Sequence, residues 1–317
     1  MTNINPSSEL TVGEMYETWK DDINLVLVAG RAGLGKKIEV NKVSKLGLRM
    51  VETDIELEHG KVQVLGGSEL TYFAKLSEPA KGMLAEVLTH QNVPCYIISK
   101  NITAPKELID TCEQEGMPFF TTGEHTGRLI GFLNSRLEER LAPFVTVHGL
   151  LMDIHGIGVL ILGQSGIGKS ESALDLILRG SKLVADDVVI VRKIGDKLVG
   201  VSPETIRYLM EVRGVGIINV KDMFGRASVL AKREIELIVE LLDWDEESEE
   251  FDRTGLSQKS YELIGVHLPY TLLPVQLGRN MATIIEVAVR NEILKSSGHS
   301  AGERLEQIFE SSEEENA

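Results

Sequence analysis

A glycine-rich stretch between an apolar run and a helical pattern constrains this chain more than any other feature. Residues 163–170 read Gly-Gln-Ser-Gly-Ile-Gly-Lys-Ser, which fits the P-loop pattern G-x-x-x-x-G-K-S. The apolar run 158–162 is typical of a buried strand, and residues 169–179 carry apolar side chains at helical spacing, with Gly180 placed to end the helix. Strand, glycine loop and helix together set a helix N-terminus behind a bound anion. The predicted phosphate-binding residues are Gly163, Gln164, Ser165, Gly166, Ile167, Gly168, Lys169 and Ser170.

Two residues of this P-loop have defined chemical roles in such a site. We expect Lys169 to neutralise the outer phosphates and the hydroxyl of Ser170 to bind Mg²⁺. The alternative is a glycine-rich turn that binds nothing. The strand and helix patterns on either side of the loop favour the phosphate site.

The overall composition is that of a soluble, acidic, globular protein. Of its 317 residues, 43% are hydrophobic and 26% are charged, and the net charge is −15. Because an acidic chain repels nucleic acids and anionic lipids, neither is expected as a partner. No apolar run is long enough to span a membrane, and the N-terminus lacks the apolar segment of a signal peptide. With Cys95 and Cys112 outside any metal-ligand spacing, we expect a cytoplasmic protein with free thiols.

Apolar runs and helical patterns alternate along the first part of the chain, which predicts a small α/β domain. Pro143 ends the last of these helices, and a second set of strands begins at residue 144. We place the boundary near residue 135, which gives an N-terminal α/β domain over residues 1–135 and a C-terminal domain over residues 136–317. The expected strands of the first domain span 24–29, 93–98 and 117–121, and the expected helices span 78–90, 104–115 and 129–141.

A second glycine-rich stretch is similar to the P-loop but lacks two of its features. Residues 30–37 fit G-x-x-x-x-G-K and follow a predicted strand. Lys37 occupies the position of the hydroxyl that would bind Mg²⁺, and residues 38–43 alternate like a strand instead of continuing as a helix. Without a helix N-terminus behind it, this stretch is interpreted as a glycine turn between two strands.

Two adjacent carboxylates follow the P-loop by one helix. Asp186 and Asp187 interrupt the apolar run 183–191, which is predicted as a strand, and buried carboxylates need a cation or hydrogen bonds. Neighbouring side chains on a strand face opposite ways, so both can serve one site only at the strand's end. The carboxyl end of a parallel strand is also where such sheets bind ligands. The alternative is a strand-end turn with hydrogen-bonded carboxylates.

Three further features are ambiguous from the residues alone. The stretch 211–219, Glu-Val-Arg-Gly-Val-Gly-Ile-Ile-Asn, fits a metal and phosphate loop as well as it fits a tight turn with a salt bridge. His155 lies in a predicted hairpin turn and is interpreted as structural. The residues leave the role of His148 open.

Several segments follow one another along the second part of the chain: residues 141–143, His148-Gly149, the P-loop with Glu171 after it, and residues 184–187, 211–220, 252–256, 274–280 and 284–288. In this order they resemble the HPr kinase/phosphorylase family. The resemblance is close over residues 130–295 and weaker over the N-terminal domain. It implies a small N-terminal α/β domain followed by a P-loop kinase domain that resembles the core of phosphoenolpyruvate carboxykinase.

The resemblance also implies an activity, cofactors and partners. Enzymes of this family use ATP or pyrophosphate to phosphorylate a serine of HPr, the phosphocarrier protein of the bacterial sugar phosphotransferase system. They also remove that phosphate with inorganic phosphate, which gives pyrophosphate, and so act in the control of carbon-source use. The expected cofactor is Mg²⁺, the expected partner is HPr, and the expected assembly is a homohexamer.

The resemblance assigns roles to residues by position. Asp187 would take the proton from the substrate serine and return one in the reverse reaction. Glu211 would bind magnesium together with Ser170. His148, Lys169 and Arg253 would complete the catalytic group.

One segment departs from the family's usual sequence. Residues 274–279 would serve mainly dephosphorylation, but Gln276 and Leu277 stand where Arg and Pro are usual. One cation fewer near a phosphate predicts weaker phosphorolysis relative to kinase activity.

Two other classes of function remain open. A small-molecule P-loop kinase or a nucleotide-dependent carboxykinase would use Lys169, Ser170 and Asp187 in a similar way on a metabolite. A nucleotide-gated regulatory or scaffold protein would bind ATP with negligible transfer.

Overall fold

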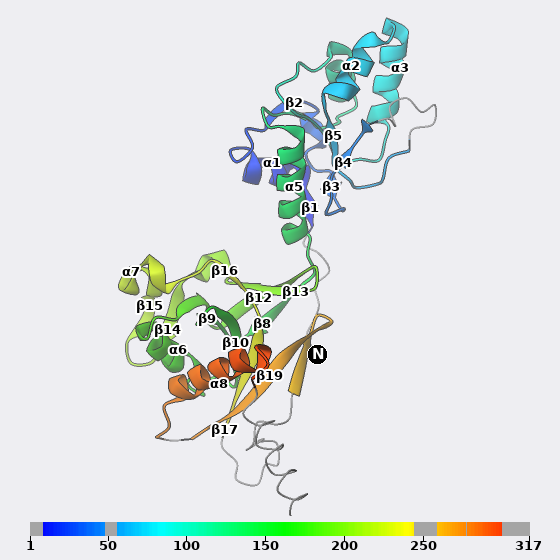
Figure 1. The fold of residues 1–317 in the computed structure, drawn as a ribbon. Helices are drawn as coiled ribbons and strands as arrows, with labels where there is room; N and C mark the ends of the chain where they lie inside the picture. The colour runs from blue at the N-terminus through cyan, green and yellow to red at the C-terminus, as the bar shows by residue number, and fades with distance from the viewer. Residues whose placement is uncertain (1–8, 48–55, 244–258, 277, 300–317) are drawn as a thin grey trace, which may run out of the picture. The chain divides into compact units, whose positions relative to one another are not determined.

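The chain folds into two compact units, and the division between them along the sequence falls after Ala142 (Figure 1). The structure is a computed structural model that describes residues 9–47, 56–243, 259–276 and 278–299. The division lies beyond residue 135 because helix α5 (Thr126–Arg140) belongs wholly to the first unit. Its leucines at positions 129, 133 and 137 are fully buried in the core of that unit.

A five-stranded sheet forms the centre of the first unit, in the order β2-β7-β6-β5-β4. Strands β4 to β7 are parallel, and β2 is antiparallel to β7 at one edge. The strands are β2 (Val26–Ala29), β4 (Ser44–Lys45), β5 (Gln63–Leu65), β6 (Tyr96–Ile98) and β7 (Phe119–Thr121), with a separate pair β1 (Leu10–Thr11) and β3 (Lys37–Ile38).

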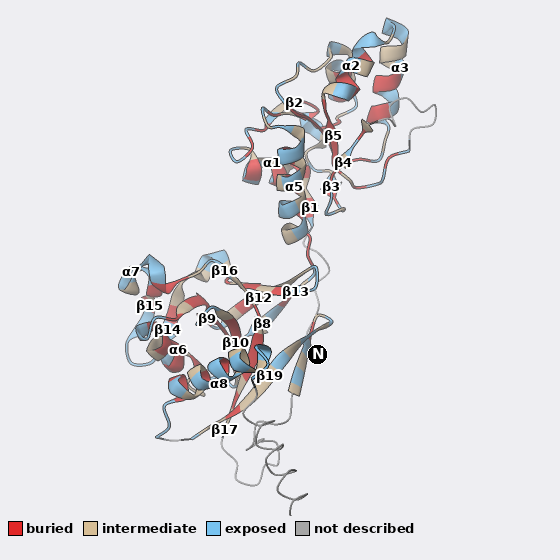
Figure 2. Ribbon diagram, in the orientation of Figure 1, coloured by how far each residue is buried: buried red, intermediate tan, exposed pale blue. Residues whose placement is uncertain are grey.

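Helices cover both faces of this sheet. Buried residues of one group of helices share a core cluster with one face of the sheet, and those of a second group share a cluster with the other face. Figure 2 shows buried residues in red along the strands and helices of this unit. The first group is α2 (Gly67–Lys75), α3 (Glu78–Thr89) and α4 (Lys106–Gln114), and the second is α1 (Val12–Trp19) and α5. The predicted α/β domain is therefore confirmed, and the two buried cysteines are free thiols.

The second glycine-rich stretch makes a turn and no long helix. After Gly30, whose φ is +72°, only a three-residue 3₁₀ turn forms, at Arg31–Gly33. A Cβ atom at Gly30 would collide with the backbone carbonyl of Met117, so close packing explains this glycine. The Lys36 ammonium lies 3.6 Å from the sulfur of Met117, and burial lowers its pKa. The strand predicted over 38–43 was wrong beyond its first residue, since β3 ends at Ile38.

The second unit is built on a six-stranded sheet in the order β11-β9-β10-β17-β19-β18. Strands β10, β17 and β19 are parallel, and β9 runs antiparallel to its neighbours β10 and β11. The strands are β9 (Leu150–Ile154), β10 (Ile157–Gly163), β11 (Lys182–Ala185), β17 (Leu237–Asp243), β18 (Lys259–Leu263) and β19 (Val266–Val275).

A four-stranded antiparallel sheet and a separate hairpin complete this unit. The sheet order is β16-β13-β12-β8, and the hairpin leads into a short helix, α7 (Val220–Phe224). The elements are β8 (Phe144–His148), β12 (Val188–Ile194), β13 (Lys197–Val201) and β16 (Lys232–Glu234), the hairpin β14 (Leu209–Val212) with β15 (Gly216–Asn219), and 3₁₀ turns at Glu204–Ile206 and Arg226–Ser228.

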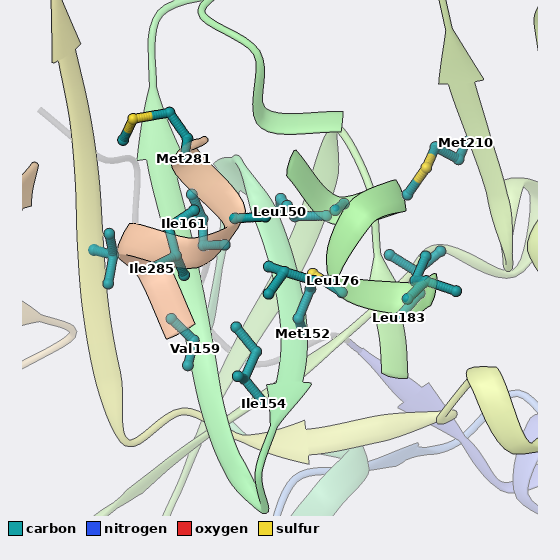
Figure 3. Packing of buried hydrophobic residues seen from close by; sticks show 14 of the residues in the cluster. Leu150, Met152, Ile154, Val159, Ile161, Leu176, Leu183, Met210, Met281 and Ile285 are labelled. Atoms are coloured by element: carbon teal, nitrogen blue, oxygen red, sulfur yellow. The ribbon is translucent and has the colours of Figure 1, made fainter. Parts of the chain in front are cut away.

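Two helices pack on one face of the six-stranded sheet and the second sheet packs on the other. Helices α6 (Lys169–Leu178) and α8 (Met281–Ser296) share one core cluster with alternate residues of β9, β10 and β17, while the intervening residues pack with β12 and β13. Figure 3 shows Met281 and Ile285 of α8 beside Ile161 and Val159 of β10. Among the described residues, no helix is long and apolar enough to cross a membrane.

Candidate active site

The P-loop joins β10 to α6, and its glycines are required by backbone conformation and close packing. Gly163 ends β10 with φ +143°, and a Cβ there would lie 2.7 Å from the carbonyl oxygen of Leu241. Gly168 has φ +99° and forms the N-cap of α6. A Cβ on Gly166, where φ is +87°, would lie 2.6 Å from the Arg213 guanidinium. The predicted order of strand, glycine loop and helix is confirmed.

Lys169 and Ser170 both hydrogen-bond within this region. Lys169 is 8% exposed, and its ammonium donates to the carbonyl oxygens of Gly163 and Gln164, at 2.8 and 2.9 Å. The Ser170 hydroxyl lies 3.2 Å from each carboxylate oxygen of Asp186. Burial lowers the pKa of the Lys169 ammonium, and the carboxylates of Asp186 and Asp187 oppose that shift.

The two aspartates lie between strands instead of within one. The single strand predicted over residues 183–191 was wrong, because β11 ends at Ala185 and β12 begins at Val188. Asp187 has φ +66°, a left-handed conformation that breaks the extended run. Since β10 and β11 both run antiparallel to β9, their carboxyl ends share one edge of the sheet. Both carboxylates therefore lie beyond a strand's end, beside the P-loop.

Asp186 and Asp187 differ in exposure and in hydrogen bonding. The side chain of Asp187 is 68% exposed, whereas Asp186 is 8% exposed. Burial raises the pKa of the Asp186 carboxyl, and the charge of Asp187 adds to this. Hydrogen bonds from the Ser170 hydroxyl and from the backbone N–H groups of Glu211 and Asp187 act in the opposite direction. The exposed Asp187 is therefore the better placed of the two to meet a substrate.

Strand pairing brings His148 to Asp187. His148 ends β8, opposite Val188 of β12, and its Nδ1 lies 3.0 Å from Oδ1 of Asp187. An ionised carboxylate can only accept, so the ring N–H donates. His155 instead lies in the turn between β9 and β10, where its Nε2 lies 2.8 Å from Oε1 of Glu286. The structural interpretation of His155 agrees with this position.

The stretch 211–219 folds as the hairpin β14–β15, with Glu211 paired to Ile217 across the two strands. The backbone N–H of Glu211 donates to the Asp186 carboxylate. The hairpin also carries Arg213, which the sequence analysis included only in the charged stretch 211–219 and did not name as a site residue. Its guanidinium lies against Gly166. The sequence shows a cation beside glycines, but only the three-dimensional fold reveals that this cation lies next to the P-loop.

These side chains surround one cavity of about 320 Å³. The cavity brings together the P-loop, Asp187, His148 and Glu211, all of which the sequence singled out. Arg253 and Leu277 lie outside the described residues. The lining comprises His148, Ser165, Gly166, Gly168, Lys169, Ser170, Glu171, Asp186, Asp187, Ile206, Leu209, Met210, Glu211, Arg213 and Ile217.

The donor set suits a magnesium ion that is shared with a phosphate ligand. Mg²⁺ binds oxygen and typically takes one or two carboxylates together with water and phosphate oxygens. Ser170, Asp186 and Glu211 supply such oxygens in this cavity. Within the described part of the chain, no cluster of three or more His, Cys, Asp or Glu side chains forms a metal site made by protein alone.

Comparison with known proteins identifies the family. Residues 139–309 match the family described as HPr Serine kinase C-terminal domain, and residues 10–137 match HPr Serine kinase N terminus. An HPr kinase/phosphorylase of Geobacter sulfurreducens is 41% identical over 305 residues, which cover 96% of this chain and 95% of that relative. The chain belongs to the HPr kinase/phosphorylase family.

Other members of the HPr kinase/phosphorylase family match at a similar level. HPr kinase/phosphorylase 1 of Oceanobacillus iheyensis is 41% identical over 286 residues, covering 90% of this chain and 92% of the relative. A solved structure, the Hpr(Ser) kinase/phosphatase from Coxiella burnetii, is 35% identical with a TM-score of 0.46, and the match covers 48% of this chain and 93% of that chain. The predicted family, its enzyme class and the predicted order of an α/β domain before a kinase domain are confirmed.

Proposed function

We propose that this chain phosphorylates a serine of HPr with ATP or pyrophosphate, and dephosphorylates phosphoserine-HPr with inorganic phosphate to give pyrophosphate. The observation that carries the proposal is the exposed Asp187 carboxylate, held by His148 at the cavity that also contains Lys169 and Ser170. A base that contacts solvent beside a P-loop is suited to a hydroxyl on a large, external substrate.

In the kinase direction, Asp187 accepts the proton of the serine hydroxyl. The serine oxygen forms its bond to the terminal phosphorus as the bond from that phosphorus to the bridging oxygen of the donor breaks. His148 keeps the Asp187 carboxylate oriented through its 3.0 Å contact. Lys169 and Arg213 are the cations beside the loop that would offset charge on the phosphates.

In the reverse direction, the same residues act with opposite proton flow. An oxygen of inorganic phosphate forms a bond to the phosphorus of phosphoserine as the bond from that phosphorus to the serine oxygen breaks. Asp187 gives a proton to the serine oxygen and regains one from the attacking hydrogen phosphate. The products are serine and pyrophosphate, so atoms and charge balance without any further reactant. Arg253 and residues 274–279 are proposed to assist, and the missing cation at Gln276 is proposed to weaken this direction.

Magnesium would bind Ser170 and Glu211, with Asp186 as a further oxygen donor. When bound, it would supply charge neutralisation on the phosphates.

We further propose a homohexamer, a role in carbon catabolite control and a kinase core similar to that of phosphoenolpyruvate carboxykinase. Light scattering should give about six times the 34.9 kDa chain mass.

An Asp187→Asn variant tests the proposed base. Asn tolerates the left-handed backbone of this position, so the fold should be kept. With labelled ATP, Mg²⁺ and purified HPr, the wild type should form labelled phosphoserine, and the variant should lose transfer by about 10²-fold or more while still binding ATP. Asp196→Asn, on the exposed turn after β12, is the matched control and should keep wild-type transfer.

The same assay separates the other functions. Label on a metabolite and none on HPr would indicate a small-molecule kinase or carboxykinase, and ATP binding without transfer would indicate a regulatory or scaffold protein. Full transfer by the Asp187→Asn variant would remove Asp187 as the base.

A further inference from the structure

A set of polar contacts joins the P-loop helix α6 to the start of helix α8. Asn280 is the N-cap of α8, and its Oδ1 accepts from the backbone N–H of Thr283 at 2.9 Å. Its Nδ2 also donates to Asp175 of α6 at 3.2 Å, and its Oδ1 lies 3.4 Å from a guanidinium nitrogen of Arg179. Both polar atoms of the cap are therefore engaged by α6.

Arg179, the C-cap residue of α6, makes two more contacts with α8. Its guanidinium donates to the Thr283 hydroxyl at 2.8 Å and lies 3.4 Å from Oε2 of Glu286. The other oxygen of Glu286 is taken by His155 at 2.8 Å and Arg290 at 3.0 Å, and this set of donors lowers the pKa of Glu286 to about 2. Because Arg290 contacts Glu286 from within α8, that ion pair does not link the two helices.

The segment that joins β19 to Asn280 begins at the same edge of the sheet as the P-loop. Strands β10, β17 and β19 are parallel, Gly163 pairs with Leu241 of β17, and Val275 at the end of β19 pairs with Asp243 of β17. The chain thus leaves β19 two strands away from the P-loop strand, or about 10 Å at the usual strand spacing. The exposed residues Gly278, Arg279 and Asn280 follow this edge along the chain, and Arg279 gives the short run a positive charge.

We propose that Asp175 and Arg179 are positioning residues which, by holding Asn280, fix Arg279 relative to the P-loop. The inference deepens the proposed function and rests on it, because the phosphate of that reaction is what Arg279 would meet. Helix α6 begins with Lys169 and anchors the cap next to Arg279. The backbone next to Arg279 is therefore tied to the helix that begins with Lys169.

Apolar packing makes this role distinct from simple attachment of α8. Met281, Ala282, Ile285 and Val289 are buried against the sheet and α6, so α8 has its own hydrophobic anchorage. The contact of Arg179 with Glu286 lies along the helix body, but the contacts of Asn280 and Thr283 lie at the N-cap and in the first turn, where they restrain the residues before the helix. Their loss should move Arg279 and leave the fold in place.

A double-mutant cycle tests whether Arg179 acts through Arg279. Each of Arg179→Ala and Arg279→Ala should lower kcat/KM for phosphorolysis by about 10-fold. If the proposal holds, the double variant should have the same kcat/KM as Arg279→Ala alone. If the two residues acted independently, the double variant should lose about 100-fold in kcat/KM. Arg179→Lys should recover part of the loss, and the control Arg290→Ala should stay within about twofold of wild type.

Hydrogen exchange gives a readout that does not depend on the reaction. The backbone amides of residues 278–283 should exchange faster in Arg179→Ala and in Asp175→Ala, and at the wild-type rate in Arg290→Ala. Unchanged exchange in the first two variants, or additive kinetic losses in the cycle, would overturn the positioning role. If the wild type transfers no phosphate, the proposed function fails, while the exchange rates still decide the role of the cap.

Discussion

At the scale of single residues, backbone conformation and neighbouring atoms leave no room for a side chain at two glycines of the P-loop, Gly163 and Gly166. Gly166 combines a φ of +87° with the Arg213 guanidinium 2.6 Å from the place a Cβ would take. Gly166→Ala should therefore strain the loop by about 1–3 kcal/mol and displace Arg213. We expect the affinity for pyrophosphate or ATP to fall by about 10-fold or more in an equilibrium titration. Unchanged affinity would show that neither the turn nor the position of Arg213 matters for binding.

The buried Asp186 gives a second residue-scale prediction, on stability. Its pKa is raised mainly by burial, so the folded chain holds this proton more tightly than the unfolded chain does. Stability therefore falls as pH rises from the unfolded pKa of about 3.9 to the raised folded pKa, and each pH unit between the two costs about 1.4 kcal/mol. Asp186→Asn should remove this penalty.

Thermal unfolding at a series of pH values checks this prediction. Asp186→Asn should be more stable than the wild type at neutral pH, equal to it at a pH below the unfolded pKa, and deficient in magnesium-dependent transfer. A variant that melts lower at neutral pH would mean that the hydrogen bonds to the carboxylate outweigh its burial.

At the scale of elements, local patterns predicted the helices and the P-loop strand well. The expected helices at 78–90 and 104–115 are α3 and α4 to within two residues, and the P-loop lies between β10 and α6. The pattern failed where backbone conformation decides, as at Asp187, whose positive φ divides the expected strand 183–191. The approach of His148 to Asp187 depends on the register of β8 with β12, which is set by non-local packing and has no local signal.

Helix α5 provides an element-scale prediction that is independent of the site. Gly131 lies exposed in its interior, and a Cβ there would have no atom within 4 Å. Gly131→Ala should stabilise the first unit by up to about 1 kcal/mol through helix propensity alone. A raised melting temperature with unchanged ATP affinity is expected, which also makes it the control for Gly166→Ala. A lower melting temperature would contradict the open space that surrounds Gly131 in the structure.

At the scale of the whole molecule, the chain has separate hydrophobic cores for its two units. The first unit buries two clusters around its own sheet, and the described strands of each sheet all come from one unit. A fragment of residues 1–142 should therefore fold alone and unfold cooperatively in a circular-dichroism melt. A broad, non-cooperative melt would show that the unit depends on the remainder of the chain.

The hydrogen bonds of Lys169 have a consequence for which anions this enzyme can take up. In the structure the ammonium is already shared between two carbonyl oxygens of its own loop, at 2.8 and 2.9 Å. A ligand must compete with both oxygens for one cation, so a single weak negative charge gains little by entering. A di- or polyphosphate, with several charges spread over neighbouring oxygens, can displace both carbonyls. We therefore expect this loop to take up di- and polyphosphates in preference to chloride and other abundant monovalent anions.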